Sequence, residues 1–147
     1  MADLNRNATS TWRGDLRSGA GVVSTESGAL NDVKLNFVSR FENGGGSNPE
    51  ELIAAAHAGC YSMALANGLS GDGHVPDYVT TKATVTLRTG AAGPKVAKIH
   101  LDVEGKVPGI DAAAFQAAAE KTKETCPISR LLLPGLEEVT LTATLAE

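Results

Sequence analysis

The sequence predicts an α+β fold in which short strands precede and separate helices that pack on a sheet. Two observations carry this prediction: strand-like alternation recurs along the chain, and one long apolar segment begins with strong helix-start signals. Of the 147 residues, 42% are hydrophobic and 20% are charged, as in ordinary globular proteins. A chain of this length typically forms one core, so we expect residues 1–147 to form a single domain.

The N-terminal region predicts three strands. Residues 9–25 should form a hairpin that turns at residues 17–19, because Trp12 and the Val22-Val23 pair are flanked by turn formers. A third strand is expected over residues 33–41, where apolar and polar side chains alternate, with Arg40 facing away from Phe37. The glycine-rich residues 43–47 should form a flexible loop.

Residues 48–68 begin with the features of a helix start. Asn48 fits the N-cap, Pro49 the first helical position and Glu51 the third, and Asn67-Gly68 should end the helix. Between these ends the segment is apolar on every side, which is typical of a buried helix.

The C-terminal half predicts a second hairpin, two helices and a last strand. Residues 78–88 and 96–103 alternate on either side of a turn at residues 90–94. Asp111 can cap a helix that runs to about Thr122, and Pro127 can begin a short helix that reaches Leu133. Residues 139–145 alternate as a final strand.

Charge and hydropathy exclude two classes of partner. The net charge is -4 and no basic run occurs, so we expect neither nucleic acid nor an anionic membrane surface as a partner. There is no stretch of 18 apolar residues that could span a bilayer, and the N-terminal residues lack the apolar core of a secretory signal. We therefore expect a cytoplasmic protein.

Only two cysteines occur, Cys60 and Cys126, and in a reducing compartment they favour a functional thiol pair over a structural disulfide. Cys126 precedes Pro127, so it should cap a helix start whose dipole favours a thiolate. Cys60 lies in the middle of the apolar helix, where burial raises a thiol pKa, and it would need a cation from elsewhere.

Simpler interpretations of these residues stay open. Cys60 could be a small core residue and Cys126 a packed cap. His57 stands three residues before Cys60 and could be a base or a metal ligand, although such a histidine is more often hydrogen-bonded in a core. A zinc site of His57, Cys60 and Cys126 has no standard spacing. His74 and His100 are the other histidines.

The run RFENGGGSNPEELIAAAHAGCYSMALANGL, residues 40–69, resembles the signature region of the OsmC/Ohr family of osmotically inducible and organic hydroperoxide resistance proteins. The resemblance extends to WRGDLRSGAGVVSTESGALN near the start and to VPGIDAAAF and CPISRLL further on. AAHAGCYSMAL and VPGID are closer to the OsmC branch. Gly59 and Tyr61 stand where Ala and Phe are expected.

The resemblance implies a thiol-dependent peroxidase that reduces organic hydroperoxides in oxidative or osmotic stress. Cys60 would be peroxidatic and Cys126 resolving, Arg40 would supply the cation beside Cys60, and Glu50 would hold Arg40. It implies hairpins in curved sheets around a long central helix and an intertwined homodimer. No cofactor or metal is expected. The reductant would be an external dithiol of lipoyl type, thioredoxin or a low-molecular-weight thiol.

Helix geometry adds a hypothesis about the number of chains. Glu50 and Cys60 are ten residues apart on the predicted helix, a rise of about 15 Å, so they cannot share a site within one chain. Glu50 should then come from a partner chain in a two-fold dimer.

A different class of function also stays open, namely a non-catalytic stress-responsive binding protein of the same fold.

Overall fold

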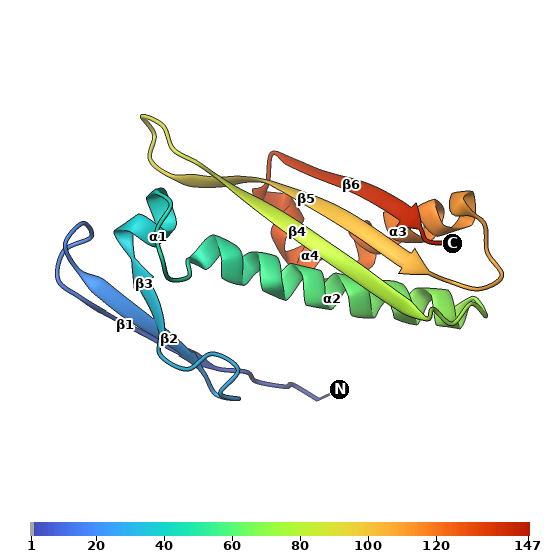
Figure 1. Ribbon diagram of the computed structural model, residues 1–147, viewed down its shortest axis with the longest axis horizontal. Helices are drawn as coiled ribbons and strands as arrows, with labels where there is room; N and C mark the ends of the chain where they lie inside the picture. Colours follow the sequence, from blue (N-terminus) through green and yellow to red (C-terminus); the bar gives the residue numbers. More distant parts are fainter. Residues whose placement is uncertain (1) are drawn as a thin grey trace. The chain divides into compact units, whose positions relative to one another are not determined.

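The computed structural model describes residues 2–147, and the chain divides into two compact units, residues 1–52 and 53–147. In the first unit, β1 (Ala8–Arg13), β2 (Ala20–Thr25) and β3 (Val33–Asn36) form an antiparallel sheet in the order β1-β2-β3 (Figure 1). The predicted N-terminal hairpin is confirmed, with its turn over residues 14–19.

The predicted strand over residues 33–41 is wrong in its second half. β3 ends at Asn36, and residues 37–41 form the short helix α1 (Phe37–Phe41). The Asn36 side chain accepts a hydrogen bond from the Ser39 backbone N–H at 2.7 Å, and the Asn36 N–H donates to the Ser39 hydroxyl at 3.2 Å. This reciprocal capping box outweighs the alternation that favours a strand. Arg40 therefore belongs to a helix.

The long helix α2 (Pro49–Gly71) begins where the sequence predicts. The Asn48 side chain caps it by accepting a hydrogen bond from the Glu51 N–H at 2.8 Å. The helix ends at Gly71, beyond the predicted Asn67-Gly68, because Leu69 is buried in the core and the extra turn carries it. The prediction of burial on every side is also wrong. A stripe along α2 is exposed, formed by Ala55, Ala56, Gly59, Met63 and Asn67.

The second unit is built on the sheet β4 (Tyr78–Arg88), β5 (Lys95–Lys106) and β6 (Glu138–Leu145). β4 and β5 form the predicted hairpin, whereas β6 pairs with β5 in parallel. A parallel pair needs a crossover. Here it consists of α3 (Ala112–Thr125), α4 (Pro127–Leu132) and the 3-10 turn η1 (Leu133–Gly135) (Figure 1). Asp111 caps α3 as predicted, by accepting from the Ala114 N–H at 2.8 Å.

The core of the second unit lies between one face of this sheet and the helices. α2 supplies Tyr61, Leu65 and Leu69, and α3 supplies Phe115 and Ala119. Every second residue of β5 is buried from Ala97 to Gly105. The buried face of β5 and the inner sides of α2 and α3 therefore fix where α2 lies on the sheet.

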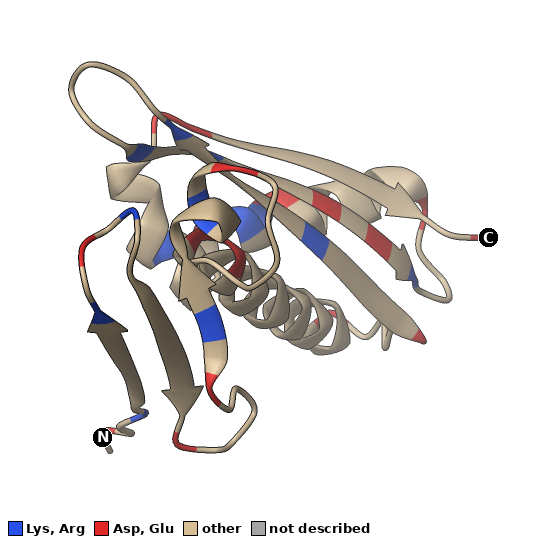
Figure 2. Cartoon of the chain, turned by 60° about the vertical axis from the view of Figure 1, so that its left-hand side comes forward, with Lys and Arg blue, Asp and Glu red and all other residues tan. Residues whose placement is uncertain are grey.

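The other face of the sheet is polar. Basic and acidic residues are interspersed along β4 and β5 (Figure 2). The exposed ones include Lys82, Lys98, Asp102 and Glu104. These residues form no surface of a single sign. Among residues 2–147, no helix has both the length and the apolar character needed to cross a membrane.

Candidate active site

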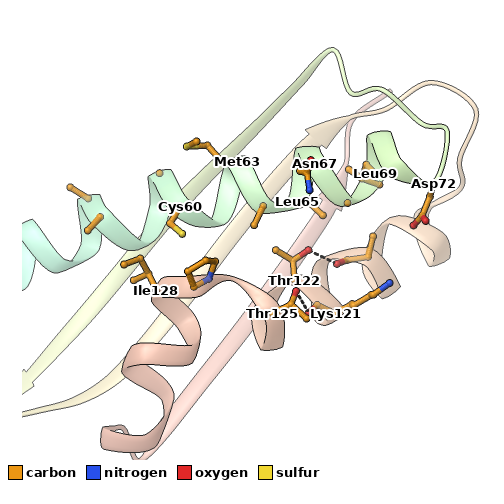
Figure 3. A pocket seen from close by; sticks show the side chains of 17 residues that line it. Cys60, Met63, Leu65, Asn67, Leu69, Asp72, Lys121, Thr122, Thr125 and Ile128 are labelled. Carbon is orange, nitrogen blue, oxygen red and sulfur yellow. Dashed lines mark hydrogen bonds between the residues drawn. The ribbon is translucent and has the colours of Figure 1, made fainter. Parts of the chain in front are cut away.

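The two cysteines meet in the second unit although 66 positions separate them. The Cys126 thiol donates a hydrogen bond to the Cys60 sulfur, with 3.3 Å between the two Sγ atoms. Both are free thiols; Cys126 is buried and Cys60 is partly exposed. In Figure 3 the Cys60 sulfur points from α2 toward Ile128 at the start of α4.

Cys126 is held at this place by two helix ends. It is both the C-cap of α3 and the N-cap of α4, and its backbone N–H donates to the Thr122 carbonyl at 2.9 Å. Pro127 follows at the first position of α4, as the sequence predicts. The Cys126 side chain makes no capping hydrogen bond. Its sulfur is therefore free to face Cys60.

Burial raises the pKa of Cys60 above its ordinary value, and the neighbouring Cys126 raises it further. A hydrogen bond from the Ile128 backbone N–H opposes this and favours the thiolate. Ile128 is the second residue of α4, where helix amides have no partner within the helix. Within the second unit burial is the largest influence, so a thiolate at Cys60 needs a further positive group.

Cys60 opens into a cavity of about 920 Å³ lined by α2, α3 and the start of α4. Most of the lining is apolar or small, including Met63, Ala64 and Ile128 around the thiol. Asn67, Asp72 and Lys121 add polar groups to it. The cavity can hold an apolar molecule against the sulfur.

Arg40 and Glu50 form a pair within the first unit. Arg40 Nη2 lies 2.9 Å from Glu50 Oε1, and Arg40 Nε lies 3.3 Å from both carboxylate oxygens. The Glu50 side chain is 9% exposed and that of Arg40 is 34% exposed. Arg40 also stands over the Phe41 ring, 5.3 Å from its centroid. A fork-like contact of this kind fixes the orientation of a guanidinium group.

His57 is buried and its Nε2 lies 2.8 Å from the hydroxyl oxygen of Ser129 on α4. Burial lowers the pKa of His57, which keeps the ring neutral. Its Nδ1 is buried without a hydrogen-bond partner. Across residues 2–147, no group of three His, Cys, Asp or Glu side chains is arranged to hold a metal ion. The hypothesis of a zinc site at His57, Cys60 and Cys126 thus has no ligand set there.

The structure brings the four predicted site residues together as two pairs, Cys60 with Cys126 and Arg40 with Glu50, each within one unit. Sequence reasoning did not find Ile128 and Ser129. For Ile128 a signal existed, since the amides that follow an N-terminal proline in a helix are free. For Ser129 there was none, because its partner is 72 positions away.

Comparison with known proteins identifies the family. The family described as OsmC-like protein matches residues 42–140. A protein of Escherichia coli named peroxiredoxin OsmC is 46% identical over 129 residues, which cover 88% of this chain and 90% of that protein. The organic hydroperoxide resistance protein of Xanthomonas axonopodis pv. citri is 30% identical and matches 76% of this chain and 78% of its own. The chain therefore belongs to the OsmC family.

Solved structures share the fold. The organic hydroperoxide resistance protein OhrB of Bacillus subtilis has a TM-score of 0.72 at 24% identity, over 94% of this chain and 98% of its own. An OsmC-like protein of Mycoplasma pneumoniae has a TM-score of 0.73 at 14% identity, over 99% and 100% of the two chains. The mixed α+β fold expected from the resemblance is thereby confirmed.

Proposed function

We propose that this protein is a thiol peroxidase that reduces organic hydroperoxides to alcohols. The observation that carries the proposal is the 3.3 Å contact between the free thiols of Cys60 and Cys126. The names of the relatives, a peroxiredoxin in E. coli and an organic hydroperoxide resistance protein in Xanthomonas, support it. A defence against oxidative or osmotic stress, in the cytoplasm, fits this chemistry.

The reaction has three balanced steps. The Cys60 thiolate attacks the distal oxygen of the hydroperoxide, the O–O bond breaks, and the alkoxide takes a proton and leaves as an alcohol. Cys60 is then a sulfenic acid. The Cys126 sulfur attacks it, the S–O bond breaks, and the oxygen leaves as water with the thiol proton. An external dithiol, of lipoyl type, thioredoxin or a small thiol, reduces the disulfide by exchange. We propose no bound cofactor or metal.

An organic substrate suits the surroundings of Cys60. The cavity of about 920 Å³ beside the sulfur is lined mainly by small and apolar side chains. Apolar surface gains free energy when an alkyl or aryl group displaces water, and hydrogen peroxide has no such group. This supports a preference for organic hydroperoxides.

Arg40 is the cation that we propose for Cys60, with Glu50 holding it and with two chains sharing the site. Arg40 and Glu50 pair within one chain, so they act as one group. α2 is unbroken from Pro49 to Gly71, which preserves the ten-residue helical separation of Glu50 from Cys60. We therefore propose a homodimer in which the Arg40–Glu50 pair of one chain serves the Cys60 of the other. The exposed stripe of α2 supports this, since Ala55, Ala56 and Gly59 are small enough to let a second chain approach the cavity beside Cys60.

The test follows the consumption of cumene hydroperoxide and of hydrogen peroxide with dithiothreitol, for wild type, Cys60→Ser and Cys126→Ser. We expect Cys60→Ser to lose turnover. Cys126→Ser should complete one reaction per chain without reductant and stop at a sulfenic acid, which a dimedone probe labels. Unchanged turnover in Cys60→Ser would refute the proposal, and no turnover by the wild type would favour the non-catalytic binding protein.

A further inference from the structure

Two side-chain contacts join α2 to the start of α4, in addition to the hydrogen bond from the Ile128 backbone N–H to Cys60. One is the sulfur–sulfur contact of Cys60 and Cys126. The other is the hydrogen bond between His57 and Ser129, at 2.8 Å. His57 precedes Cys60 by three residues and Ser129 follows Cys126 by three, so the two contacts are one helical turn apart on both helices. Because α2 and the start of α4 run in opposite directions, the two contacts lie side by side between them, like rungs of a ladder. The hydrogen bond is the His57–Ser129 rung.

The His57–Ser129 rung is one of the tertiary contacts that hold α4 in place. α4 has six residues, too few to be stable by itself, so tertiary contacts must hold it. All of α4 is described, and within it only Ser129 is buried; Ile128 and Leu132 are partly buried against the core. The fully buried anchor of α4 is therefore a hydroxyl group, and its side-chain partner is the ring of His57.

We propose that His57 and Ser129 are positioning residues for disulfide formation, holding the start of α4 against α2 so that Cys126 stays within reach of oxidised Cys60. This inference rests on the proposed function, because the sulfenic acid comes from that reaction. The side-chain hydrogen bond of each of these residues is to the other. By restraining α4, they raise the effective concentration of the Cys126 sulfur at Cys60.

The geometry permits the rung to persist through the reaction. The sulfur atoms are 3.3 Å apart as thiols, and a disulfide brings them to about 2.05 Å. This closure of about 1.3 Å is smaller than the spacing of one helical turn, about 5.4 Å, so α4 need not change its register on α2. Because rung and disulfide restrain the same helices, each should favour the other.

The unpaired nitrogen of His57 is consistent with this role. Nδ1 is buried and has no partner, whichever nitrogen carries the proton. Such an atom disfavours the folded state, and an apolar side chain would avoid it. A residue needed only for packing has no reason to carry this penalty. A residue needed for its bond to Ser129 does.

The first measurement is the equilibrium between the dithiol and the disulfide in dithiothreitol redox buffers, which needs no hydroperoxide. For Ser129→Ala we expect an equilibrium constant for the disulfide about tenfold smaller than in wild type, which is about 30 mV for a two-electron couple. Tyr61→Phe is the matched control. It removes another buried bond of α2, from the Tyr61 hydroxyl to the Ala119 carbonyl on α3, and should leave the constant unchanged.

The second measurement separates the two oxidation steps. After one equivalent of cumene hydroperoxide, the dimedone-reactive sulfenic acid of Ser129→Ala should decay about tenfold more slowly than that of wild type. Loss of the Cys60 thiol should also slow, because the Ile128 N–H that favours the thiolate lies on the same turn of α4. His57→Leu should behave like Ser129→Ala. His57→Gln can place an amide near the former Nε2 and should restore most of the rate. The two His57 variants decide the question if Ser129→Ala does not fold.

The outcomes distinguish this inference from the proposed function. If wild-type Cys60 is not oxidised by hydroperoxide, the peroxidase fails, whereas the redox-buffer equilibrium still tests the rung. If Cys60 is oxidised but Ser129→Ala and His57→Leu match wild type in both the equilibrium and the sulfenic acid decay, the positioning role is wrong. Equal losses in His57→Gln and His57→Leu would also contradict it, because they would show an effect of packing alone.

Discussion

At the scale of single residues, the site combines two groups that oppose their surroundings. Cys60 must ionise although burial raises its pKa, and the single backbone N–H of Ile128 offsets only part of that effect. His57 keeps a hydrogen bond to Ser129 through Nε2, although its Nδ1 is buried without a partner. Residues whose pKa is shifted by burial are common at functional sites, where neighbouring groups stabilise the form that burial disfavours.

Burial of His57 predicts a pH dependence of stability. The unfolded chain takes up a proton on this histidine near its ordinary value of 6.5, whereas the folded chain does not until a lower pH. The unfolded state thus binds more protons in that window, so the free energy of unfolding should fall as the pH drops below 6.5. The limit for one proton is about 1.4 kcal/mol per pH unit, and the contribution vanishes above that range.

Urea unfolding at pH 7.5 and 5.5 checks this prediction, with His57→Gln as the control. The variant lacks the titrating ring and keeps a polar side chain, while His74 and His100 are the same in both proteins. We expect the wild type to lose more stability than His57→Gln on acidification. An identical loss in both would show that His57 titrates alike in the folded and unfolded chains.

At the scale of elements, the positions of the two cysteines depend on how firmly α2 and α3 pack on the sheet. Phe115 of α3 packs its ring onto Gly105 of β5, where an added Cβ would lie 2.7 Å from two ring carbons. Gly105 is buried in the strand and Phe115 is fully buried. A glycine is needed here because the ring occupies the space of a side chain.

Gly105→Ala should therefore lower the free energy of unfolding by about 1–3 kcal/mol, since the ring has to move in a close-packed core. Gly68→Ala in α2 is the contrasting variant, because a Cβ at Gly68 meets no atom within 4 Å. Alanine is favoured over glycine inside a helix, so this change should be neutral or raise stability by up to about 1 kcal/mol. Chemical denaturation of both variants provides the comparison, and a tolerated Gly105→Ala would contradict this account of α3 packing.

The sequence was most informative where local signals act alone. The caps at Asn48 and Asp111 predicted the starts of α2 and α3, and alternation predicted the β4–β5 hairpin. The strand prediction was wrong for residues 37–41 because their apolar spacing fits a strand as well as a short helix. The Asn36–Ser39 capping box favours the helix. The parallel pairing of β6 with β5 has no local signal.

The same limit applies to the site. The resemblance to a family indicated four residues, and two of them, Cys60 and Cys126, meet because a crossover brings the start of α4 to the middle of α2. The contribution of Ile128 and the bond between His57 and Ser129 depend on that tertiary arrangement. The spacing of these residues along the sequence does not reveal that arrangement.

At the scale of the whole molecule, the proposed active site needs two chains, and complementation tests this. Arg40→Ala and Cys60→Ser should each be inactive alone. When the two are unfolded, mixed and refolded together, the mixed dimers should regain one working site, which has Cys60 from the first variant and Arg40 from the second. About half of the molecules should be mixed if pairing is random.

Each variant refolded separately is the control, and peroxidase turnover per chain is the measurement. We expect roughly a quarter of the wild-type activity from the mixture, because half of the dimers are mixed and each has one of two sites intact. A mixture as inactive as its parts would mean that Arg40 serves the Cys60 of its own chain.

The parallel pairing of β5 and β6 has a consequence during synthesis. Cys126 lies in the crossover between these strands, and the crossover is fixed only when residues 138–145 have been made and have added to the sheet. On the ribosome, a chain therefore displays Cys60 on a nearly complete α2 well before its partner thiol is in place. In that interval a sulfenic acid at Cys60 would have no thiol to resolve it. Cys60 would also lack the Arg40 of a partner chain that we propose to activate it, so both activation and resolution wait for a completed and paired chain.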